Sequence, residues 1–146
     1  MSSDRAEREF SAGGVVVRGD EVAVVVPTRR GARGQLVLAL PKGHPDGDES
    51  PEEAARREVR EETGLDAELV DKLGDVRYWY QRGGRRIAKR VAFFLFDFRS
   101  GSLDDHDHEI IEARWLRLET AARELTYPGE REMVERAMAR RAGAER

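Results

Sequence analysis

The sequence predicts one α/β domain, in which helices pack on the faces of a mixed sheet. Three observations lead to this fold class. Segments rich in valine and aromatic residues alternate with segments of helical character. Glycine-containing turns join four of the extended segments into two hairpins. One helix has capping residues at both of its ends. The chain has 146 residues, which is enough for a hydrophobic core without disulfide or metal cross-links.

The first expected hairpin joins residues 10–17 to residues 21–26. Both segments are rich in valine, and Arg18-Gly19-Asp20 between them is typical of a tight turn. A short apolar strand is expected at residues 35–40, ending at Pro41.

A helix is expected over residues 50–63. Ser50 can cap its N-terminus, Pro51 suits the first helical position, and Glu53 completes a capping box. Gly64 can adopt the left-handed conformation that ends a helix.

The second expected hairpin joins residues 67–80 to residues 85–98, because Gly83-Gly84 between these β-rich segments is a strong turn signal. Another strand is expected at residues 113–118, and a short helix from Glu119.

The last helix is expected over residues 129–140, with Met133, Ala137 and Met138 on one face. This face would pack against the sheet.

Residues 1–146 are interpreted as a single domain whose ends, residues 1–9 and 142–146, are flexible. The absence of cysteine excludes thiol catalysis, cysteine zinc sites and disulfides. No apolar run approaches the ~20 residues of a membrane span, and residues 1–10 lack the apolar stretch of a secretory signal. We therefore expect a cytoplasmic protein without a membrane partner; a monomer and a homodimer are both open.

Charge is balanced overall but unevenly distributed. With 26 basic and 29 acidic residues the net charge is −3, and the bases form no extended stripe, so nucleic acid is not expected as a partner. Residues 82–90 nevertheless hold five bases and no acid, whereas residues 104–112 hold five acids and no Lys or Arg.

Three carboxylates occupy one side of the helix expected at residues 50–63. Glu58, Glu61 and Glu62 have the spacing i, i+3 and i+4, and neither Glu58 nor Glu62 has a basic residue three or four positions away. A divalent cation such as Mg²⁺, which prefers oxygen ligands, would turn their repulsion into binding. The alternative is a plain acidic helix face.

The residues before the helix favour the metal site. Gly43, Glu49 and the run Arg57-Glu58-Val59-Arg60-Glu61-Glu62-Thr63-Gly64-Leu65 have the spacing of the Nudix box, and every required position is filled. Residues 10–140 therefore resemble a Nudix hydrolase. One departure is Asp48, which stands where many relatives have glycine, while Gly47 comes one residue earlier. We expect this loop to turn differently.

The resemblance implies an α/β/α sandwich and a reaction in which Mg²⁺ or Mn²⁺ and water cleave a nucleoside diphosphate linked to another group. It implies these roles: Glu58 and Glu62 as metal ligands, Glu61 as a ligand or the base, the Gly43 carbonyl in the metal site, Arg57 and Glu49 as orienting residues, and Gly64 as the structural glycine of the box.

Further residues resemble the diadenosine polyphosphate hydrolase branch of the family. The run Leu40-Pro41-Lys42-Gly43-His44 is similar to that branch, and Glu109, six residues before Trp115, matches a glutamate that assists metal binding or acts as base. Lys89 and Phe93 fall where the branch has a phosphate-contacting lysine and a base-stacking aromatic. The nucleoside polyphosphate substrate would then be a dinucleoside polyphosphate such as diadenosine tetra- or hexaphosphate.

Several other residues have two interpretations each. Lys42 and His44 could contact phosphate, although His44 could equally face solvent. Tyr80 and Tyr127 could stack on a base, or Tyr80 could simply pack in its strand. Residues 105–108 could bind a metal, but a solvated loop is favoured.

Two alternative functions stay open from the sequence. One is a MutT-like enzyme that releases pyrophosphate and a monophosphate from nucleoside triphosphates; the other is a nucleotide-binding sensor without catalysis. Because the box recognises the diphosphate, an inositol pyrophosphate or capped RNA is also compatible. The number of metal ions and the general base are open. The bases of residues 82–90 and the acids of residues 104–112 are expected to form two walls of one cleft.

Overall fold

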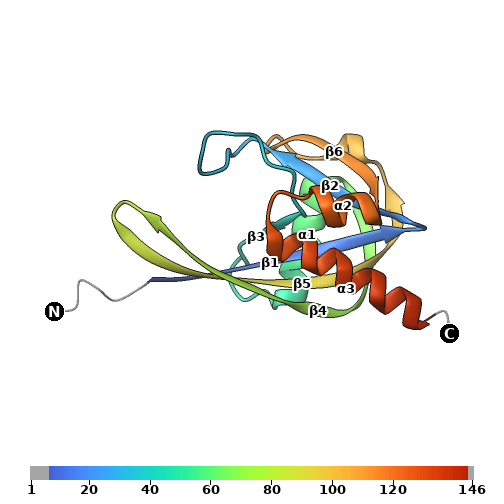
Figure 1. Cartoon of the computed structure of the whole chain (residues 1–146). Helices are drawn as coiled ribbons and strands as arrows, with labels where there is room; N and C mark the ends of the chain where they lie inside the picture. Colours follow the sequence, from blue (N-terminus) through green and yellow to red (C-terminus); the bar gives the residue numbers. More distant parts are fainter. Residues whose placement is uncertain (1–6, 145–146) are drawn as a thin grey trace.

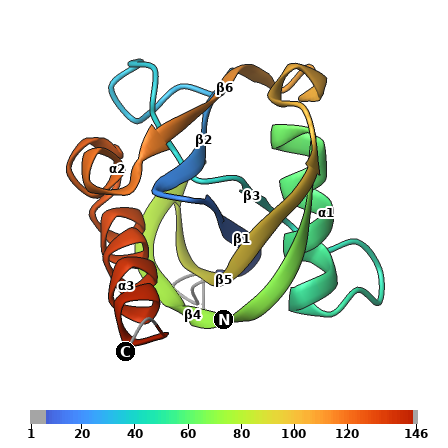
Figure 2. The ribbon, with the colours of Figure 1, turned by 90° about the vertical axis from the view of Figure 1, so that its right-hand side faces the viewer.

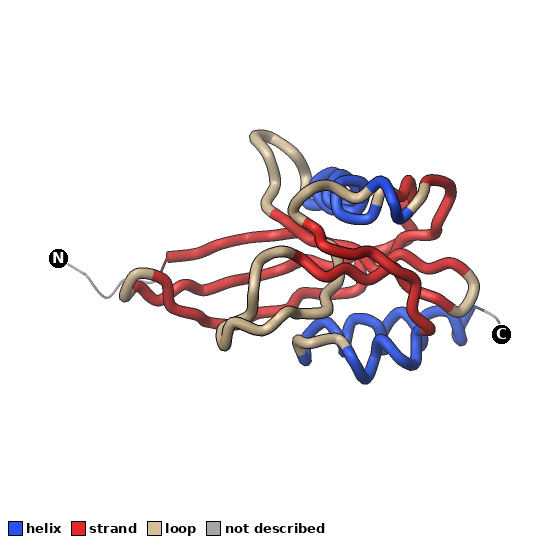
Figure 3. The backbone as a smooth tube through the Cα atoms, turned by 90° about the horizontal axis from the view of Figure 1, so that it is seen from above, coloured by secondary structure: helices blue, strands red, loops and turns tan. Residues whose placement is uncertain are grey.

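The computed structural model describes residues 7–144. A sheet of six strands forms its centre, and helices cover both faces (Figure 1; Figure 3). The strands are β1 (Glu7–Arg18), β2 (Glu21–Pro27), β3 (Lys42–Gly43), β4 (Leu65–Arg82), β5 (Arg85–Gly101) and β6 (Ile110–Arg117). The helices are α1 (Pro51–Thr63), α2 (Leu118–Glu124) and α3 (Pro128–Ala144), with a 3-10 turn, η1 (Leu103–Asp105).

The sheet is mixed, as predicted. Its strand order is β4-β5-β1-β2-β6, with the short β3 on β1. The hairpin pairs are antiparallel, whereas β1 and β5 run parallel from Glu7↔Ile87 to Val17↔Asp97. Both predicted hairpin turns are confirmed: Gly19 has φ 59°, and Gly83 and Gly84 have φ 59° and 77°, values that favour glycine.

The prediction of a strand at residues 35–40 is wrong. Only Ala39 makes an isolated bridge there, to Val25, and the strand at this place is β3. The physical reason is that side chains from the end of the chain take the backbone donors: Leu38 N–H donates to Thr126 Oγ1 and Leu40 N–H to Glu130 Oε1, both at 2.8 Å.

The helix ends agree with the prediction. Ser50 Oγ accepts from Glu53 N–H at 3.1 Å, and Glu53 Oε1 accepts from Ser50 N–H at 2.8 Å, which completes the capping box. Gly64 adopts φ 74° and donates to Arg60 O at 2.9 Å. On the solvated side, Arg56 and Arg60 both pair with Asp66, and not with the glutamates one turn away.

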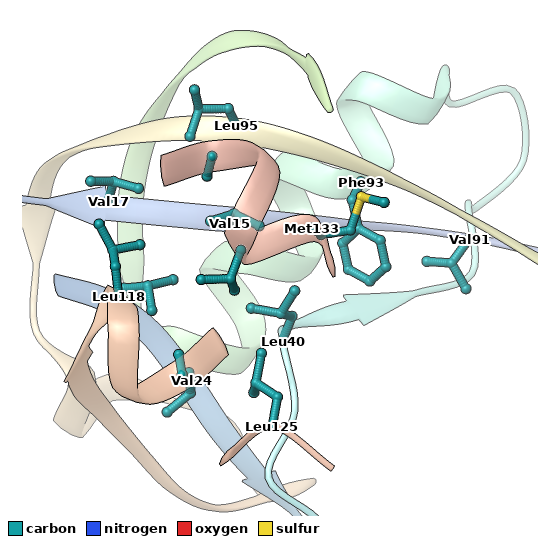
Figure 4. Packing of buried hydrophobic residues seen from close by; sticks show 14 residues of the cluster. Val15, Val17, Val24, Leu40, Val91, Phe93, Leu95, Leu118, Leu125 and Met133 are labelled. Atoms are coloured by element: carbon teal, nitrogen blue, oxygen red, sulfur yellow. The ribbon is translucent and has the colours of Figure 1, made fainter. Parts of the chain in front are cut away.

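Each face of the sheet has its own core. Figure 2 shows α1 on one side and α2 with α3 on the other. Alternation along β5 sends Phe93 toward α3 and Phe94 toward α1. Phe93 lies beside Met133 in Figure 4, and Met133 and Ala137 are buried as predicted for the last helix.

The ends of the described chain belong to regular elements. Residues 7–9 lie in β1 and residues 142–144 in α3, where flexible ends were expected, while residues 1–6 and 145–146 lie outside the described residues. Within residues 7–144, no helix has the length and apolar character needed to cross a membrane.

Candidate active site

Two partly buried carboxylates of α1 face the short strand β3. Glu62 Oε1 accepts from the Lys42 backbone N–H at 3.2 Å. A Cβ added at Gly43 would lie 1.8 Å from Glu58 Oε2, so only glycine leaves room for this carboxylate. Gly43, Glu58 and Glu62, predicted from the box, are thus brought together.

Arg57 orients the loop before α1. Its Nε and Nη2 donate to the two oxygens of Glu49 at 2.8 and 2.9 Å. Nη2 also donates to His44 O at 2.9 Å, and Nη1 donates to Glu61 Oε2 at 2.9 Å. The hydrogen bonds from Arg57, followed by the Asp46 backbone N–H, lower the pKa of Glu49 to about 2. The same ion pairs raise the pKa of Arg57.

The loop turns at Gly47. This glycine has φ 50°, and Glu49 N–H donates to Asp46 O at 3.0 Å. The left-handed turn of this loop is therefore made by Gly47, one residue before the position where many relatives have glycine. Asp48, which occupies that position, is exposed.

Burial disfavours the ionised forms of Glu58 and Glu62 when no cation is beside them. Burial raises the pKa of Glu58 to about 7, against the lowering effect of Arg57. Burial, reinforced by the charge of Glu58, raises the pKa of Glu62 to about 8. In residues 7–144 no three His, Cys, Asp or Glu side chains form a closed metal cage. Mg²⁺ is commonly held by only one or two carboxylates, with waters and substrate phosphates as its other ligands. The donors present fit such an ion.

The loop before β6 also reaches α1. Asp107 N–H donates to Glu61 O at 2.8 Å, and Glu109 N–H donates to Asp107 Oδ1 at 3.0 Å. Burial is the main cause of the raised pKa of Glu58 and of Glu62. The negative charge of Glu109 makes a smaller contribution to the raised pKa of Glu58, and that of Asp107 makes one to the raised pKa of Glu62. This loop is therefore one wall beside the carboxylates. Asp107 faces α1 in addition to Glu109, which sequence reasoning had preferred.

Glu130 of α3 was missed by sequence reasoning. Its buried carboxylate accepts from Leu40 N–H at 2.8 Å and from Lys42 Nζ at 2.7 Å. Burial alone would lower the pKa of Lys42, but Glu130 outweighs it and raises that pKa. Lys42 Nζ also lies 5.5 Å from the centre of the Tyr127 ring. Glu130 belongs to no motif, so only the fold could reveal it.

Lys89 is a second nearly buried lysine on the same side of the sheet. Its Nζ donates to Ser11 Oγ at 2.6 Å and lies 3.6 Å from Glu9 Oε1. Burial lowers the pKa of Lys89. Lys42 stands opposite Gly13 of β1, two residues along that strand from the Ser11 that Lys89 contacts.

The aromatic residues are arranged differently from the expectation. Phe93 is fully buried in the core, so the expectation that it stacks on a base is wrong. The Tyr80 hydroxyl donates to Glu9. Tyr127 is 40% exposed beside Lys42, and Tyr78 is 44% exposed. Tyr78 stands opposite Lys89 in the sheet, and this alternation is the signal that could have identified it.

The remaining expectations concern His44 and the basic hairpin. His44 Nδ1 lies 3.1 Å from Phe10 O. Arg82 and Arg85 pair with Glu9 and Glu7 at a hairpin tip that projects away from the body (Figure 1). The expectation that residues 82–90 form the second wall of the cleft is therefore wrong for Arg82 and Arg85, whereas Lys89 of the same stretch lies on the sheet side that α3 covers.

Comparison with known proteins decides the family. The NUDIX domain model matches residues 8–137. The chain belongs to the Nudix hydrolase family. This Nudix chain is 38% identical over 136 residues to the Mycobacterium tuberculosis protein named MutT4, covering 90% of this chain and 55% of that protein.

Two further proteins are similar to this Nudix chain. It is 36% identical over 98 residues to an 8-oxo-(d)GTP phosphatase of Mycolicibacterium smegmatis, covering 67% of this chain and 29% of that one. The chain thus spans only part of these relatives. A solved Caenorhabditis elegans Ap4A hydrolase complex has the same fold, with a TM-score of 0.67, 21% identity, and 92% and 98% of the two chains covered.

Proposed function

We propose that this Nudix protein is a metal-dependent pyrophosphohydrolase, which cleaves a diphosphate linkage of a nucleoside polyphosphate by attack of water on phosphorus. The observation that carries the proposal is the approach of Glu58 to Gly43 and of Glu62 to the Lys42 backbone N–H, where burial disfavours the anions unless a cation is present. Glu58, Glu62 and the Gly43 carbonyl would hold Mg²⁺, or Mn²⁺ in its place, with Glu61 near them. When bound, the ion supplies Lewis acidity and acidifies water.

The residues of the chain divide the other tasks. Lys42, opposite Gly13, and Lys89, bonded to Ser11, lie at neighbouring places along β1, and their ammonium groups would bind the polyphosphate. His44, two residues after Lys42, would contact the same polyphosphate. Arg57 and Glu49 hold the loop against α1.

Glu109 is our candidate for the general base. Glu61 Oε1 and Oε2 both accept from Arg57 Nη1, at 3.2 and 2.9 Å, so both oxygens of this carboxylate are already engaged by a cation. Among the described residues, the exposed Glu109 carboxylate has no such ion pair. It can therefore take the proton of the attacking water more readily.

For the substrate we propose a dinucleoside polyphosphate. The support is the Pro41-Lys42-Gly43-His44 run with Glu109, together with two lysines suited to a long polyphosphate. The C. elegans neighbour is named an Ap4A hydrolase. Tyr127, exposed beside Lys42, and Tyr78, exposed opposite Lys89, would contact a base, whereas Tyr80 is engaged by Glu9. A cytoplasmic location also stays a prediction, as does a monomer or homodimer.

Nucleoside triphosphates are a second candidate substrate. The buried Phe93 cannot supply the base contact of the dinucleotide branch. One relative is named an 8-oxo-(d)GTP phosphatase. Release of pyrophosphate with a higher kcat/KM for triphosphates than for any dinucleotide would favour this candidate.

A substrate panel tests the proposal. The protein is incubated with Mg²⁺ and with diadenosine tetra- and hexaphosphate, nucleoside triphosphates and oxidised nucleoside triphosphates, and the products are separated. Turnover of a dinucleoside polyphosphate above a Glu62→Gln control is expected. Tight nucleotide binding without turnover of any member would instead support a sensor, and would contradict the enzyme.

A further inference from the structure

A three-stranded extension, which we call the arm, projects from the body of the protein (Figure 1). It consists of residues 7–10 of β1, 76–82 of β4 and 85–91 of β5. The strands are paired in register, so that Ala88 lies opposite both Arg8 and Trp79. Residues opposite one another in neighbouring strands share a face. The pairings therefore sort the side chains of the arm between its two faces.

One face, which we call the arginine face, collects cations and two aromatic rings. Its members are Arg8, Phe10, Arg77, Trp79, Arg86 and Arg90. The register places Arg77, Arg90 and Phe10 in one row, with Arg8 and Trp79 in the next. Arg86 lies toward the tip beyond Trp79.

The acids near the arm are sorted to its other face. Glu9 pairs with Arg82 at 2.6 Å and lies 3.6 Å from Lys89, and Glu7 pairs with Arg85. On the arginine face the acid is Asp75, 3.6 Å from Arg77 and 3.2 Å from Arg90. Within residues 7–144, no acid forms a salt bridge with Arg8 or Arg86. The arginine face thus has four cations and one acid, whereas the other face has three cations, Arg82, Arg85 and Lys89, and two acids.

The arginine face is also shaped to receive a ligand. The Arg86 guanidinium lies 4.3 Å from the centre of the Trp79 ring, and that of Arg90 lies 4.4 Å from the Phe10 ring. Trp79 is 56% exposed, and the Arg77 side chain is 73% exposed. A groove of about 960 Å³ runs along the arm. Six of its nine lining residues belong to the arginine-face side of the sheet, namely Arg8, Phe10, Arg77, Trp79, Ala88 and Arg90, and the other three are Glu9, Tyr78 and Lys89 of the opposite face.

We propose that the arginine face binds single-stranded nucleic acid. Arginines suit phosphate groups, and an exposed indole beside guanidinium planes suits stacking of a base. An acidic protein segment would match the charges but would make little use of Trp79. This site is separate from the α1 carboxylates and does not depend on the proposed hydrolysis. From the sequence, nucleic acid was not expected because the bases form no extended stripe, but the pairing of β1 with β5 and β4 gathers Arg8, Arg77, Arg86 and Arg90 on one face.

The test measures binding of fluorescein-labelled oligouridylate and oligodeoxythymidylate of ~12 nucleotides by anisotropy, in EDTA so that no hydrolysis occurs. We expect binding that weakens linearly with the logarithm of salt concentration, together with a change in Trp79 fluorescence. The two oligonucleotides show whether RNA or DNA is preferred.

Two double variants provide a matched comparison. Arg8→Gln/Arg86→Gln should weaken binding by about tenfold or more and reduce the salt slope by about 1.4. Arg82→Gln/Arg85→Gln removes the same charge from the other face of the arm, and affinity should stay within about twofold. Trp79→Ala should weaken binding by about fivefold or more and abolish the fluorescence change. Circular dichroism melting checks that each variant is folded.

Three results would overturn the inference. They are the absence of binding to both oligonucleotides at low salt, an equal loss in the two double variants, and polyglutamate binding that equals oligonucleotide binding and survives Trp79→Ala. The last result would identify an acidic protein segment as the partner. A failure of hydrolysis in the substrate panel would leave this binding measurement unaffected, so the two proposals fail separately.

Discussion

The carboxylate of Glu130, a buried residue of α3, accepts a hydrogen bond from the ammonium of Lys42 at 2.7 Å. Its other oxygen accepts from Leu40 N–H at 2.8 Å. One side chain near the end of the chain thus fixes both the backbone before β3 and the lysine that we assign to phosphate. Because Gly43 follows Lys42 directly, α3 helps to define the position of the candidate metal site.

We therefore expect Glu130→Gln to act on stability and on catalysis. Loss of one charged partner of a mostly buried pair should reduce the free energy of unfolding by about 1–3 kcal/mol. Misplacement of Lys42 should lower kcat/KM by about tenfold. Urea denaturation and kinetics with the substrate identified by the panel measure both. Glu132→Gln, on the exposed side of α3, removes a surface pair with Arg136 and should change stability by less than about 1 kcal/mol. Equal effects of the two changes would refute a positioning role.

Without metal, Glu62 should destabilise the protein at high pH. Its pKa is about 8 in the folded state, above the ordinary value of 4.5, so folding opposes ionisation. The destabilisation is absent below pH 4.5, grows as pH rises, and is complete above about pH 8. In EDTA, Glu62→Gln should match the wild type at pH 4.5 and melt about 3 °C higher or more at pH 8.5. Adding Mg²⁺ at pH 8.5 should raise Tm for the wild type only. Parallel Tm curves across the whole pH range would count against this assignment.

Gly43→Ala tests the contact between β3 and α1. The added methyl would lie 1.8 Å from Glu58 Oε2, so this carboxylate must move. We expect Mg²⁺ affinity to fall about 10–100-fold, measured by calorimetry and by the metal dependence of turnover. Gly143→Ala is the matched control, because a Cβ there meets nothing within 4 Å. Unchanged Mg²⁺ affinity in Gly43→Ala would show that Glu58 is free to relax.

Phe93 and Tyr127 should respond to substitution in opposite ways. Phe93→Leu leaves a core defect and should cost ~1 kcal/mol of stability with KM unchanged. Tyr127→Leu, at a 40% exposed position, should leave stability within about 0.5 kcal/mol and raise KM about fivefold. A raised KM in Phe93→Leu alone would restore the base-stacking role that burial argues against.

Glu109→Gln should separate the two candidate bases. Removal of a general base lowers kcat by about 100-fold or more and changes KM little. Glu61→Gln keeps an oxygen acceptor for Arg57 and should cost kcat less. The reverse order of the two losses, in single-turnover measurements at saturating metal, would assign the base to Glu61.

The parts of the fold that local residues determine could be predicted from the sequence. Ser50, Glu53 and Gly64 set the ends of α1 through their own hydrogen bonds and dihedral angles, and Gly83-Gly84 sets a turn in the same local way. The box fixes Gly43, Glu58 and Glu62 because helical periodicity places the two glutamates on one face.

The remaining features depend on contacts between distant segments. Thr126 and Glu130 accept from the backbone N–H groups of Leu38 and Leu40, so the segment expected as a strand is irregular. The alternation of β5 predicts that Phe93 and Phe94 lie on opposite faces of the sheet. Local sequence does not show which face α3 covers, so the burial of Phe93 was not predicted. Likewise Arg82 and Arg85 were expected in a wall of the cleft, but the pairing of β1 with β5 brings Glu9 and Glu7 to these two arginines instead.

The parallel pairing of β1 with β5 has a consequence for the order in which the protein can fold during synthesis. β1 leaves the ribosome first, yet its partner in the pairs Glu7↔Ile87 to Val17↔Asp97 emerges about 80 residues later. Closing so long a segment costs chain entropy and slows folding. Gly43 and α1 are synthesised before β5, but α1 packs on Phe94 and Phe96 of that strand. The nascent chain therefore carries every carboxylate of the box before β5 completes the surface under α1, and the site forms together with the centre of the sheet.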